Sequence, residues 1–439
     1  AINAYIIARN EEKTDAQLAL FEADQITADA PGASENPDDA DATESEEDSV
    51  AWSGAGSIDA MARSTAGFKN QPLATYTPVT QQMLNNPADG DWLSWRRTLD
   101  GQGFSPLDEI NTENVKGLRL AWSLAMTDGS NQGTPLVHDG VMFLTHPTNM
   151  IQAVDAATGE VLWEYSYNYP PEARLLGGPT RNIAIYEDKL FLAAYDAAIV
   201  AINAQTGAEV WRTRKADYQE AYTHSAGPIV GAGVVLSGIN GCELYTKDGC
   251  FLTGHDPDTG EELWRTSTIA APGEPGGDTW ADLPADFRAG GDMWIAGSYD
   301  PKLGLFVIGT SQPKPWVAAS RGMSPKDNAL YTNATLALDP KTGEIKWFFQ
   351  HVPGETIDME VGFERVLVDL DGKPYVLTIG KDAILWKLDL ETGEYVDLIE
   401  TLPQTIFKNV DREKGLVTYR DDIMAAQISD TVTACPGIY

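Results

Sequence analysis

Residues 155–163 read Asp-Ala-Ala-Thr-Gly-Glu-Val-Leu-Trp, and this pattern decides the fold because it recurs along the chain. Written as D-x-x-T-G-x-x-x-W, it returns at residues 203–211, 256–264, 339–347 and 389–397. Asn203 replaces the Asp in the second copy, and Asp397 replaces the Trp in the fifth. Three of the four intervals are roughly fifty residues, a period typical of one propeller blade or solenoid unit. The longer third interval predicts an insertion.

Each copy has a mechanical interpretation. The Asp and the Thr-Gly pair are typical of a tight turn with a left-handed Gly, here joining two strands of a four-stranded antiparallel sheet. The Trp follows on the second strand, where its large face can pack against the neighbouring sheet. The repeat therefore predicts a β-propeller. At the fifth copy, where Asp397 stands, we expect the interface to be closed differently or weakly.

The composition agrees with an all-β chain and excludes several functions. Among 439 residues there are 40 Gly, 25 Pro, 12 Trp and 16 Tyr, which favours many short strands over long helices. The formal net charge is -34, which disfavours binding to nucleic acid or to anionic lipid. No apolar stretch approaches the roughly 18 to 20 residues of a spanning helix, so we expect no transmembrane segment in this chain.

The chain divides into two parts by composition. Residues 11–50 are dense in Asp and Glu, with Lys13 as the only basic residue, and cannot bury enough apolar surface to fold. We expect an acidic arm there, either solvated or docked on a basic partner. Residues 51–90 are a linker or an N-terminal strap. The predicted domains are therefore an irregular segment, 1–90, and a propeller, 91–439, whose short apolar runs alternate with turn residues.

Three cysteines leave two interpretations open. Cys242 and Cys250 flank a turn-like segment and could form a disulfide, which would leave Cys435 without a partner and indicate an oxidising compartment. Alternatively, all three are buried thiols.

Three further motifs carry a family resemblance. Residues 91–95 read Asp-Trp-Leu-Ser-Trp, residues 105–111 read Ser-Pro-Leu-Asp-Glu-Ile-Asn, and residues 114–118 read Asn-Val-Lys-Gly-Leu. Together with the repeat, they resemble the pyrroloquinoline quinone (PQQ) dependent alcohol dehydrogenases. The resemblance implies an eight-bladed propeller. Because only five copies of the repeat occur, we expect a propeller that is incomplete at its C-terminus, with the missing blades in another chain or absent from this sequence.

The resemblance also implies a set of cofactor contacts. Trp294 matches the Trp on which the quinone lies, and Arg181 matches the Arg that pairs with a quinone carboxylate. Lys381 matches a basic residue near the quinone oxygens. Taken alone, these residues would be interpreted as a packing Trp and surface ion pairs. Further contacts, on a looser match, are Gln132, Ser225 and Ser237.

A metal site and a catalytic base follow from the same resemblance. Asp358 matches the base that removes the alcohol proton while hydride moves to the metal-polarised quinone. The expected metal ligands are Glu243, Gln312, Asp358 and Glu360. Gln312 stands where the family usually has Asn. Oxygen ligands favour calcium, whereas Glu360, near the position of an extra Asp in lanthanide-using members, would favour a lanthanide if it does not pair with a neighbour such as Arg365.

The remaining expectations concern the environment of the site. Leu175 and Leu176 stand where many members carry adjacent cysteines that cap the quinone, so that cap is absent here. The sequence has no C-x-x-C-H haem motif, which implies a separate electron acceptor, expected to be a cytochrome c, unless a haem domain lies in the part of the propeller protein that is missing here. The resemblance implies a periplasmic alcohol dehydrogenase that oxidises an alcohol of unspecified identity to an aldehyde or ketone. The alternative is a non-catalytic propeller of the same repeat family that acts as a binding scaffold.

Overall fold

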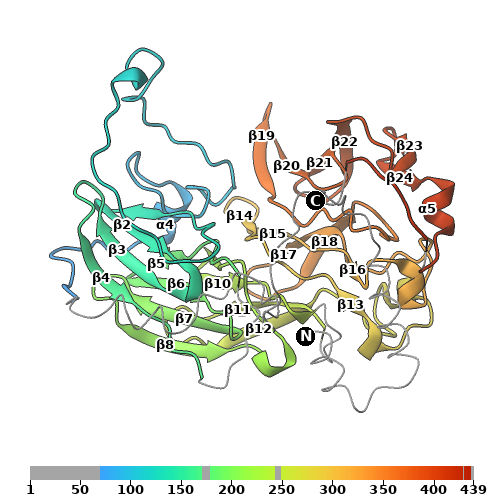
Figure 1. Cartoon of the computed structure of the whole chain (residues 1–439), viewed down its shortest axis with the longest axis horizontal. Coiled ribbons are helices and arrows are strands. Elements are labelled where there is room, and N and C mark those ends of the chain that lie inside the picture. The colour runs from blue at the N-terminus through green and yellow to red at the C-terminus, as the bar shows by residue number, and fades with distance from the viewer. Residues whose placement is uncertain (1–69, 171–177, 243–248, 429, 437–439) are drawn as a thin grey trace, which may run out of the picture.

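Five four-stranded antiparallel sheets form the framework of the part of the chain that the structure describes. The computed structural model describes residues 70–170, 178–242, 249–428 and 430–436, and the predicted acidic arm lies outside these residues. The sheets follow one another in chain order, from β1–β4 on one side of the molecule to β19–β22 on the other (Figure 1). The first two sheets contain β1 (Leu136–His138), β2 (Val141–Thr145), β3 (Ile151–Asp155) and β4 (Val161–Tyr165), then β5 (Ala184–Tyr186), β6 (Lys189–Ala193), β7 (Ala198–Asn203) and β8 (Glu209–Arg214).

The other three sheets are also antiparallel, and two short two-stranded pairs accompany them. The strands are β9 (Ile229–Gly231), β10 (Val234–Ser237), β11 (Phe251–His255) and β12 (Glu262–Ser267); β14 (Ser298–Asp300), β15 (Leu305–Gly309), β17 (Ala334–Leu338) and β18 (Ile345–Gln350); and β19 (Val366–Leu370), β20 (Lys373–Ile379), β21 (Ile384–Asp389) and β22 (Tyr395–Glu400). The two-stranded pairs are β13 (Ala289–Gly290) with β16 (Pro313–Lys314), and β23 (Phe407–Asp411) with β24 (Leu416–Tyr419).

The D-x-x-T-G segments are the turns between the third and fourth strands of the sheets. In the first, the Asp155 carboxylate accepts hydrogen bonds from the backbone N–H groups of Ala157 and Thr158 and from the Thr158 hydroxyl. These bonds lower the pKa of Asp155. Gly159 has φ +77°, a left-handed conformation that suits glycine. The predicted turn chemistry is therefore confirmed.

Each repeat Trp docks on the turn of the next sheet. The Trp163 indole covers Gly207, where a Cβ would lie 2.7 Å from the ring, and its Nε1 donates to the Ala204 carbonyl at 3.1 Å. The same ring-on-glycine contact with an indole hydrogen bond joins Trp211 to Gly260, Trp264 to Gly343 and Trp347 to Gly393.

Two docking contacts were not apparent in the repeat. Trp122, before the first copy, covers Gly159 and donates to the Ala156 carbonyl. At the fifth copy Tyr395 takes the place of the missing Trp, covering Gly415 and donating to the Arg412 carbonyl. Asp397, two residues later on β22, forms an ion pair with Arg412 at 2.8 Å. The fifth interface is thus closed differently, as the sequence predicted.

An N-terminal strap, residues 70–86, crosses the ends of the first three sheets. Its backbone bonds to Leu162, Gln205 and Glu187, and Gly233 bonds to a side chain of its short helix α4 (Gln81–Asn85). The first sheet strand begins at Leu136, so residues 91–135 are mostly loop, with the 3-10 turn η1 (Val115–Gly117) in a projection of the chain (Figure 1).

The predicted insertion in the third interval is confirmed. It contains the β13–β16 pair and the 3-10 turns η5 (Gly277–Trp280), η6 (Ala285–Phe287) and η7 (Ala318–Arg321). Other short elements are η2 (Pro147–Asn149), η3 (Tyr218–Glu220) and the helix α5 (Asp421–Ala425). No helix in the described part of the chain has the length and apolar composition needed to cross a bilayer.

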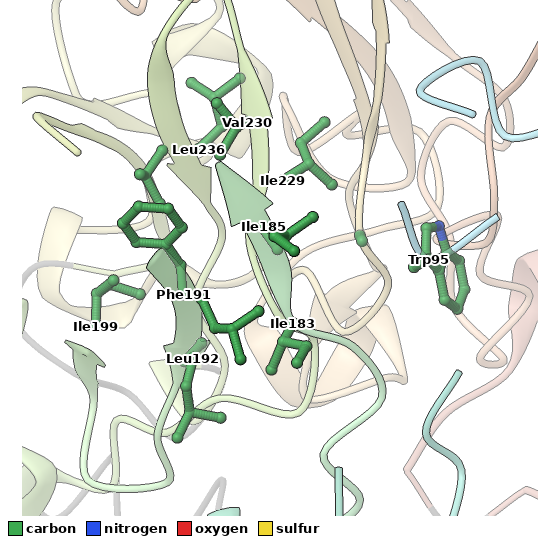
Figure 2. Close-up of a cluster of buried hydrophobic side chains, with 14 of the residues drawn as sticks. Trp95, Ile183, Ile185, Phe191, Leu192, Ile199, Ile229, Val230 and Leu236 are labelled. Atoms are coloured by element: carbon green, nitrogen blue, oxygen red, sulfur yellow. The ribbon is translucent and has the colours of Figure 1, made fainter. Parts of the chain in front are cut away.

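The main apolar core lies between neighbouring sheets. Figure 2 shows Ile185 of β5 beside Ile229 of β9, with Ile183, Phe191 and Leu236 in the same buried cluster. Cys242 and Cys250 form a disulfide, so the bridging interpretation is confirmed, and Cys435 is an exposed free thiol.

Trp163→Ala should lower the free energy of unfolding by about 3–5 kcal/mol, because it removes a fully buried indole between two sheets. Trp163→Phe should lower the free energy of unfolding by less than Trp163→Ala does, since a large part of the aromatic ring remains. In a urea titration the matched control is Val210→Ala, on an outer strand with 48% exposure, which should change stability by no more than about 0.5 kcal/mol. Equal stability of the Trp163→Ala and Val210→Ala proteins would contradict the docking role.

Candidate functional site

The predicted site residues come from loops of four consecutive sheets. Arg181 precedes β5, Ser225 precedes β9, Trp294 lies between β13 and β14, and Gln312 directly precedes β16. The catalytic candidate Asp358 lies with Glu360 between β18 and β19, and Lys381 lies between β20 and β21. The contacts described below show which of these loops meet.

Asp358 is the centre of a buried polar cluster. Its Oδ2 lies 2.9 Å from the Lys381 Nζ, and its Oδ1 accepts a hydrogen bond from the Gln312 side-chain amide. The same ammonium lies 2.9 Å from the Glu360 Oε1. Burial raises the pKa of Asp358, although the bond to Lys381 acts in the opposite direction. Burial would lower the pKa of Lys381, but the two carboxylates raise it above its ordinary value.

Glu355 supports this cluster and was not identified from the sequence. Its side chain is fully buried, and its Oε1 accepts hydrogen bonds from the Ile357 N–H at 2.6 Å and the Met359 N–H at 2.8 Å. These two amides flank Asp358, which has the uncommon left-handed φ of +65°. Glu355 thereby braces the loop that presents Asp358. The available signal was an acidic residue three positions before the expected base.

Trp294 and Arg181 form a second group beside the cluster. The Trp294 ring is partly exposed, its Nε1 donates to the Glu360 Oε2 at 3.2 Å, and Phe363 meets it edge-on with 4.9 Å between ring centroids. The Arg181 guanidinium carbon lies 5.1 Å from the Trp294 ring centroid. Its Nη1 donates to the carbonyls of Ser225 and Trp294, at 3.2 Å each. An aromatic face and a guanidinium are therefore presented together.

Ser225 belongs to the same region through Asn240, which sequence reasoning missed. The Asn240 Oδ1 accepts from the Ser225 backbone N–H at 3.1 Å, and its Nδ2 donates to the Asp292 Oδ2 at 3.2 Å. Asn240 lies three residues before Glu243, but an Asn in a loop gives no specific signal of its own.

Two of the predicted residues that the structure describes, Ser237 and Gln132, are not joined to the others. Ser237 is buried and accepts a hydrogen bond from the Lys215 Nζ at 3.3 Å, and neither residue contacts the Asp358 cluster in the described part of the chain. Gln132 is exposed, and its side-chain amide donates to Ser130 of its own loop at 3.4 Å. Glu243 lies outside the described residues, as do Leu175 and Leu176 at the expected quinone cap.

The residues present fit a hard cation and a flat anionic ring. The Gln312 Oε1 is buried and has no hydrogen-bond partner among the described residues, which suits a carbonyl-type oxygen that faces a cation. Trp294 offers a flat apolar surface beside Arg181. Within the described ranges, no three His, Cys, Asp or Glu side chains gather as a metal site, and the expected ligand Glu243 falls outside those ranges.

Comparisons with known proteins agree with this chemistry. The sequence profile of the PQQ family described as glucose/ethanol/alcohol dehydrogenase, beta-propeller domain, matches residues 92–405. The chain is 32% identical over 350 residues to the quinohemoprotein alcohol dehydrogenase ADH-IIG of Pseudomonas putida, covering 74% of this chain and 48% of that protein. The chain spans about half the length of the curated relatives it matches.

Solved structures show the same fold. The structure of the quinohemoprotein alcohol dehydrogenase ADHIIG from Pseudomonas putida HK5 superposes with a TM-score of 0.72 at 29% identity, covering 83% of this chain and 56% of that one. A europium-containing methanol dehydrogenase gives a TM-score of 0.71 at 25% identity, covering 78% and 63%. The fold is therefore an all-β propeller of this kind.

Asp382, next to Lys381, should make stability depend on pH. Its buried carboxyl accepts from the Trp386 Nε1 at 2.7 Å, and burial raises its pKa to about 7. Because the native state then holds a proton that the unfolded state releases, stability should fall as pH rises from about 4 to 7. Over this pH range, the free energy of unfolding should fall by on the order of 3 kcal/mol less in the Asp382→Asn protein than in the unsubstituted protein, as measured by urea titration. An unchanged pH slope in the Asp382→Asn protein would show that Asp382 does not titrate as described.

Proposed function

The chain belongs to the family of PQQ-dependent quinoprotein alcohol dehydrogenases, and we propose that it takes part in oxidising an alcohol to an aldehyde or ketone. The observation that carries this proposal is the convergence of Asp358, Lys381 and Gln312 beside the Trp294 face. A carboxylate base, a cation and a flat aromatic surface are the parts that such a reaction needs in one place.

Asp358 is proposed as the base that accepts the proton of the alcohol hydroxyl. Its burial excludes water, and its raised pKa makes the carboxylate a better proton acceptor than an exposed Asp. The Lys381 ammonium keeps the carboxylate available by pairing with Oδ2. Glu355 bonds to the backbone amides on either side of Asp358, so the Asp358 carboxylate keeps its direction when the substrate enters.

The cofactors are proposed to be PQQ and calcium. When bound, the quinone supplies the hydride acceptor and the ion supplies the Lewis acid that polarises its carbonyl. Trp294 would hold the ring face, Arg181 a carboxylate, and Lys381 the quinone oxygens, with Ser225 near the same edge. Asp358, the Gln312 Oε1 and Glu243 would hold the ion. Ser237 and Gln132 are retained as looser cofactor contacts, and a lanthanide is the alternative ion.

Electrons are proposed to leave to a separate cytochrome c-type acceptor in the periplasm. The Cys242–Cys250 disulfide supports an oxidising compartment. A non-catalytic scaffold is the less favoured alternative, because a scaffold has no need for a buried Asp358 cluster next to an aromatic face.

Asp358→Asn should reduce dye-linked alcohol oxidation by about two to four decades, because it removes the proton acceptor and keeps the side-chain size. Binding of PQQ, followed by its visible absorption after dialysis, should persist. Glu391→Gln, a charge removal on an exposed turn, is the control and should oxidise alcohol at the normal rate. Normal turnover by the Asp358→Asn protein would exclude Asp358 from the mechanism.

Calcium should restore alcohol oxidation to metal-free protein supplied with PQQ. Both Glu360 oxygens are bonded to Lys381 and Trp294, so this carboxylate adds less to the ion site than a lanthanide would need. The measurement is dye-linked oxidation after adding calcium or lanthanum to separate samples. Activity restored by lanthanum alone would reverse the choice of ion.

A further inference from the structure

Glu360 joins two parts of the site that the sequence does not connect. Its Oε1 lies 2.9 Å from the Lys381 Nζ, and its Oε2 accepts from the Trp294 Nε1 at 3.2 Å. The side chain is only 9% exposed, and it does not pair with Arg365, which instead donates to Thr335. Each carboxylate oxygen therefore has a defined partner.

The loop around Glu360 is itself fixed to the Lys381 loop. The Glu360 carbonyl accepts a hydrogen bond from the Lys381 backbone N–H at 3.0 Å. Gly380 permits this approach, because a Cβ at that position would overlap the Glu360 carbonyl and Val361. The Glu360 carboxylate is thus presented from a backbone position that has little freedom to move.

The Trp294 indole is oriented from the same loop. Phe363 contacts it edge-on with an interplanar angle of 81°, and a Cβ at Gly362 would lie 3.4 Å from the Trp294 Nε1. A tryptophan side chain has two rotatable angles, so an edge contact and a hydrogen bond at Nε1 together set the direction of the ring.

We propose that Glu360 is a positioning residue and not a ligand of the metal ion. Its two carboxylate oxygens hold the Trp294 ring at a fixed position relative to the Lys381–Asp358 ion pair. This role rests on the proposed function, because Trp294 is the surface on which the quinone would lie. A metal ion that drew the Glu360 Oε2 away would leave the indole N–H without its acceptor. Glu360 should therefore control quinone affinity more than calcium affinity.

Three substitutions separate these roles. Glu360→Gln keeps the length of the side chain and an oxygen for the indole N–H. Glu360→Asp keeps the charge but shortens the reach to Trp294, and Glu360→Ala removes both. Glu364→Gln is the matched control, since Glu364 lies in the same loop and pairs with Arg96 at the partly exposed surface. Circular dichroism would confirm that each full-length variant is folded.

PQQ affinity should be measured by equilibrium dialysis in metal-free buffer, and calcium affinity by calorimetry without PQQ. We expect Glu360→Ala and Glu360→Asp to weaken PQQ binding by about tenfold, with Glu360→Gln and Glu364→Gln close to the unsubstituted protein. Calcium affinity should stay within about threefold in Glu360→Gln. Unchanged PQQ affinity in Glu360→Ala, or a tenfold loss of calcium affinity in Glu360→Gln, would overturn the proposal.

A double-substitution cycle tests the contact without any cofactor. Trp294→Phe removes the indole N–H, so Glu360→Ala should shift the thermal unfolding midpoint less in the Trp294→Phe background than alone. Equal shifts in both backgrounds would overturn the positioning role. If the unsubstituted protein bound no PQQ while the cycle showed coupling, the proposed function would fail and the Glu360–Trp294 contact would stand.

Discussion

The contact of an indole ring with a glycine in the next sheet is the constraint on which the rest of this structure depends. Gly207 has no side chain, so the Trp163 ring can lie directly on its backbone while the indole N–H bonds to the Ala204 carbonyl. The flat contact fixes how far apart the two sheets are, and the hydrogen bond fixes how they are rotated. Because the same device recurs between successive sheets, each sheet is placed by the one before it.

The candidate site exists only because those placements hold. Arg181 and Trp294 come from segments more than a hundred residues apart, yet the Arg181 guanidinium bonds to the Trp294 carbonyl. Lys381 and Asp358 come from loops on either side of β19 and β20, and their ion pair needs those loops to meet. A change in the angle between sheets would move one loop against another, so the docking contacts govern the site from a distance.

The sequence predicted the parts that repeat and the parts that match a motif. The turn chemistry, the Trp docking and the insertion all follow from residues whose spacing has a physical meaning, whereas the cysteine spacing left the disulfide as one of two interpretations. Trp122 was missed because no D-x-x-T-G turn precedes it, and Tyr395 was missed because it stands two residues before Asp397. Both positions reach the same turn of the next pair of strands, because Tyr395 donates to the Arg412 carbonyl and Asp397 pairs with the Arg412 side chain. A pattern that fixes the docking residue at one position cannot detect that exchange.

Glu355 and Glu360 show a different limit of prediction from the sequence. Burial in the folded protein, and not spacing along the sequence, determines which groups their side chains bond to. The sequence shows three acidic residues at 355, 358 and 360, which alone would indicate a solvated loop. In the structure all three side chains are buried: Asp358 and Glu360 pair with Lys381, whereas Glu355 is bonded to backbone amides. Carboxylates are expensive to remove from water, so such a group is stable only when it is protonated, paired or close to a cation. Burial raises the pKa of Glu355 to about 7. The Glu360 carboxylate bonds to both Lys381 and Trp294. Asp358 is then the carboxylate that contacts the buried Gln312 amide. Asp358 and Glu360 share the Lys381 ammonium, and this sharing of one cation by two buried carboxylates supports the proposal of a metal ion beside them.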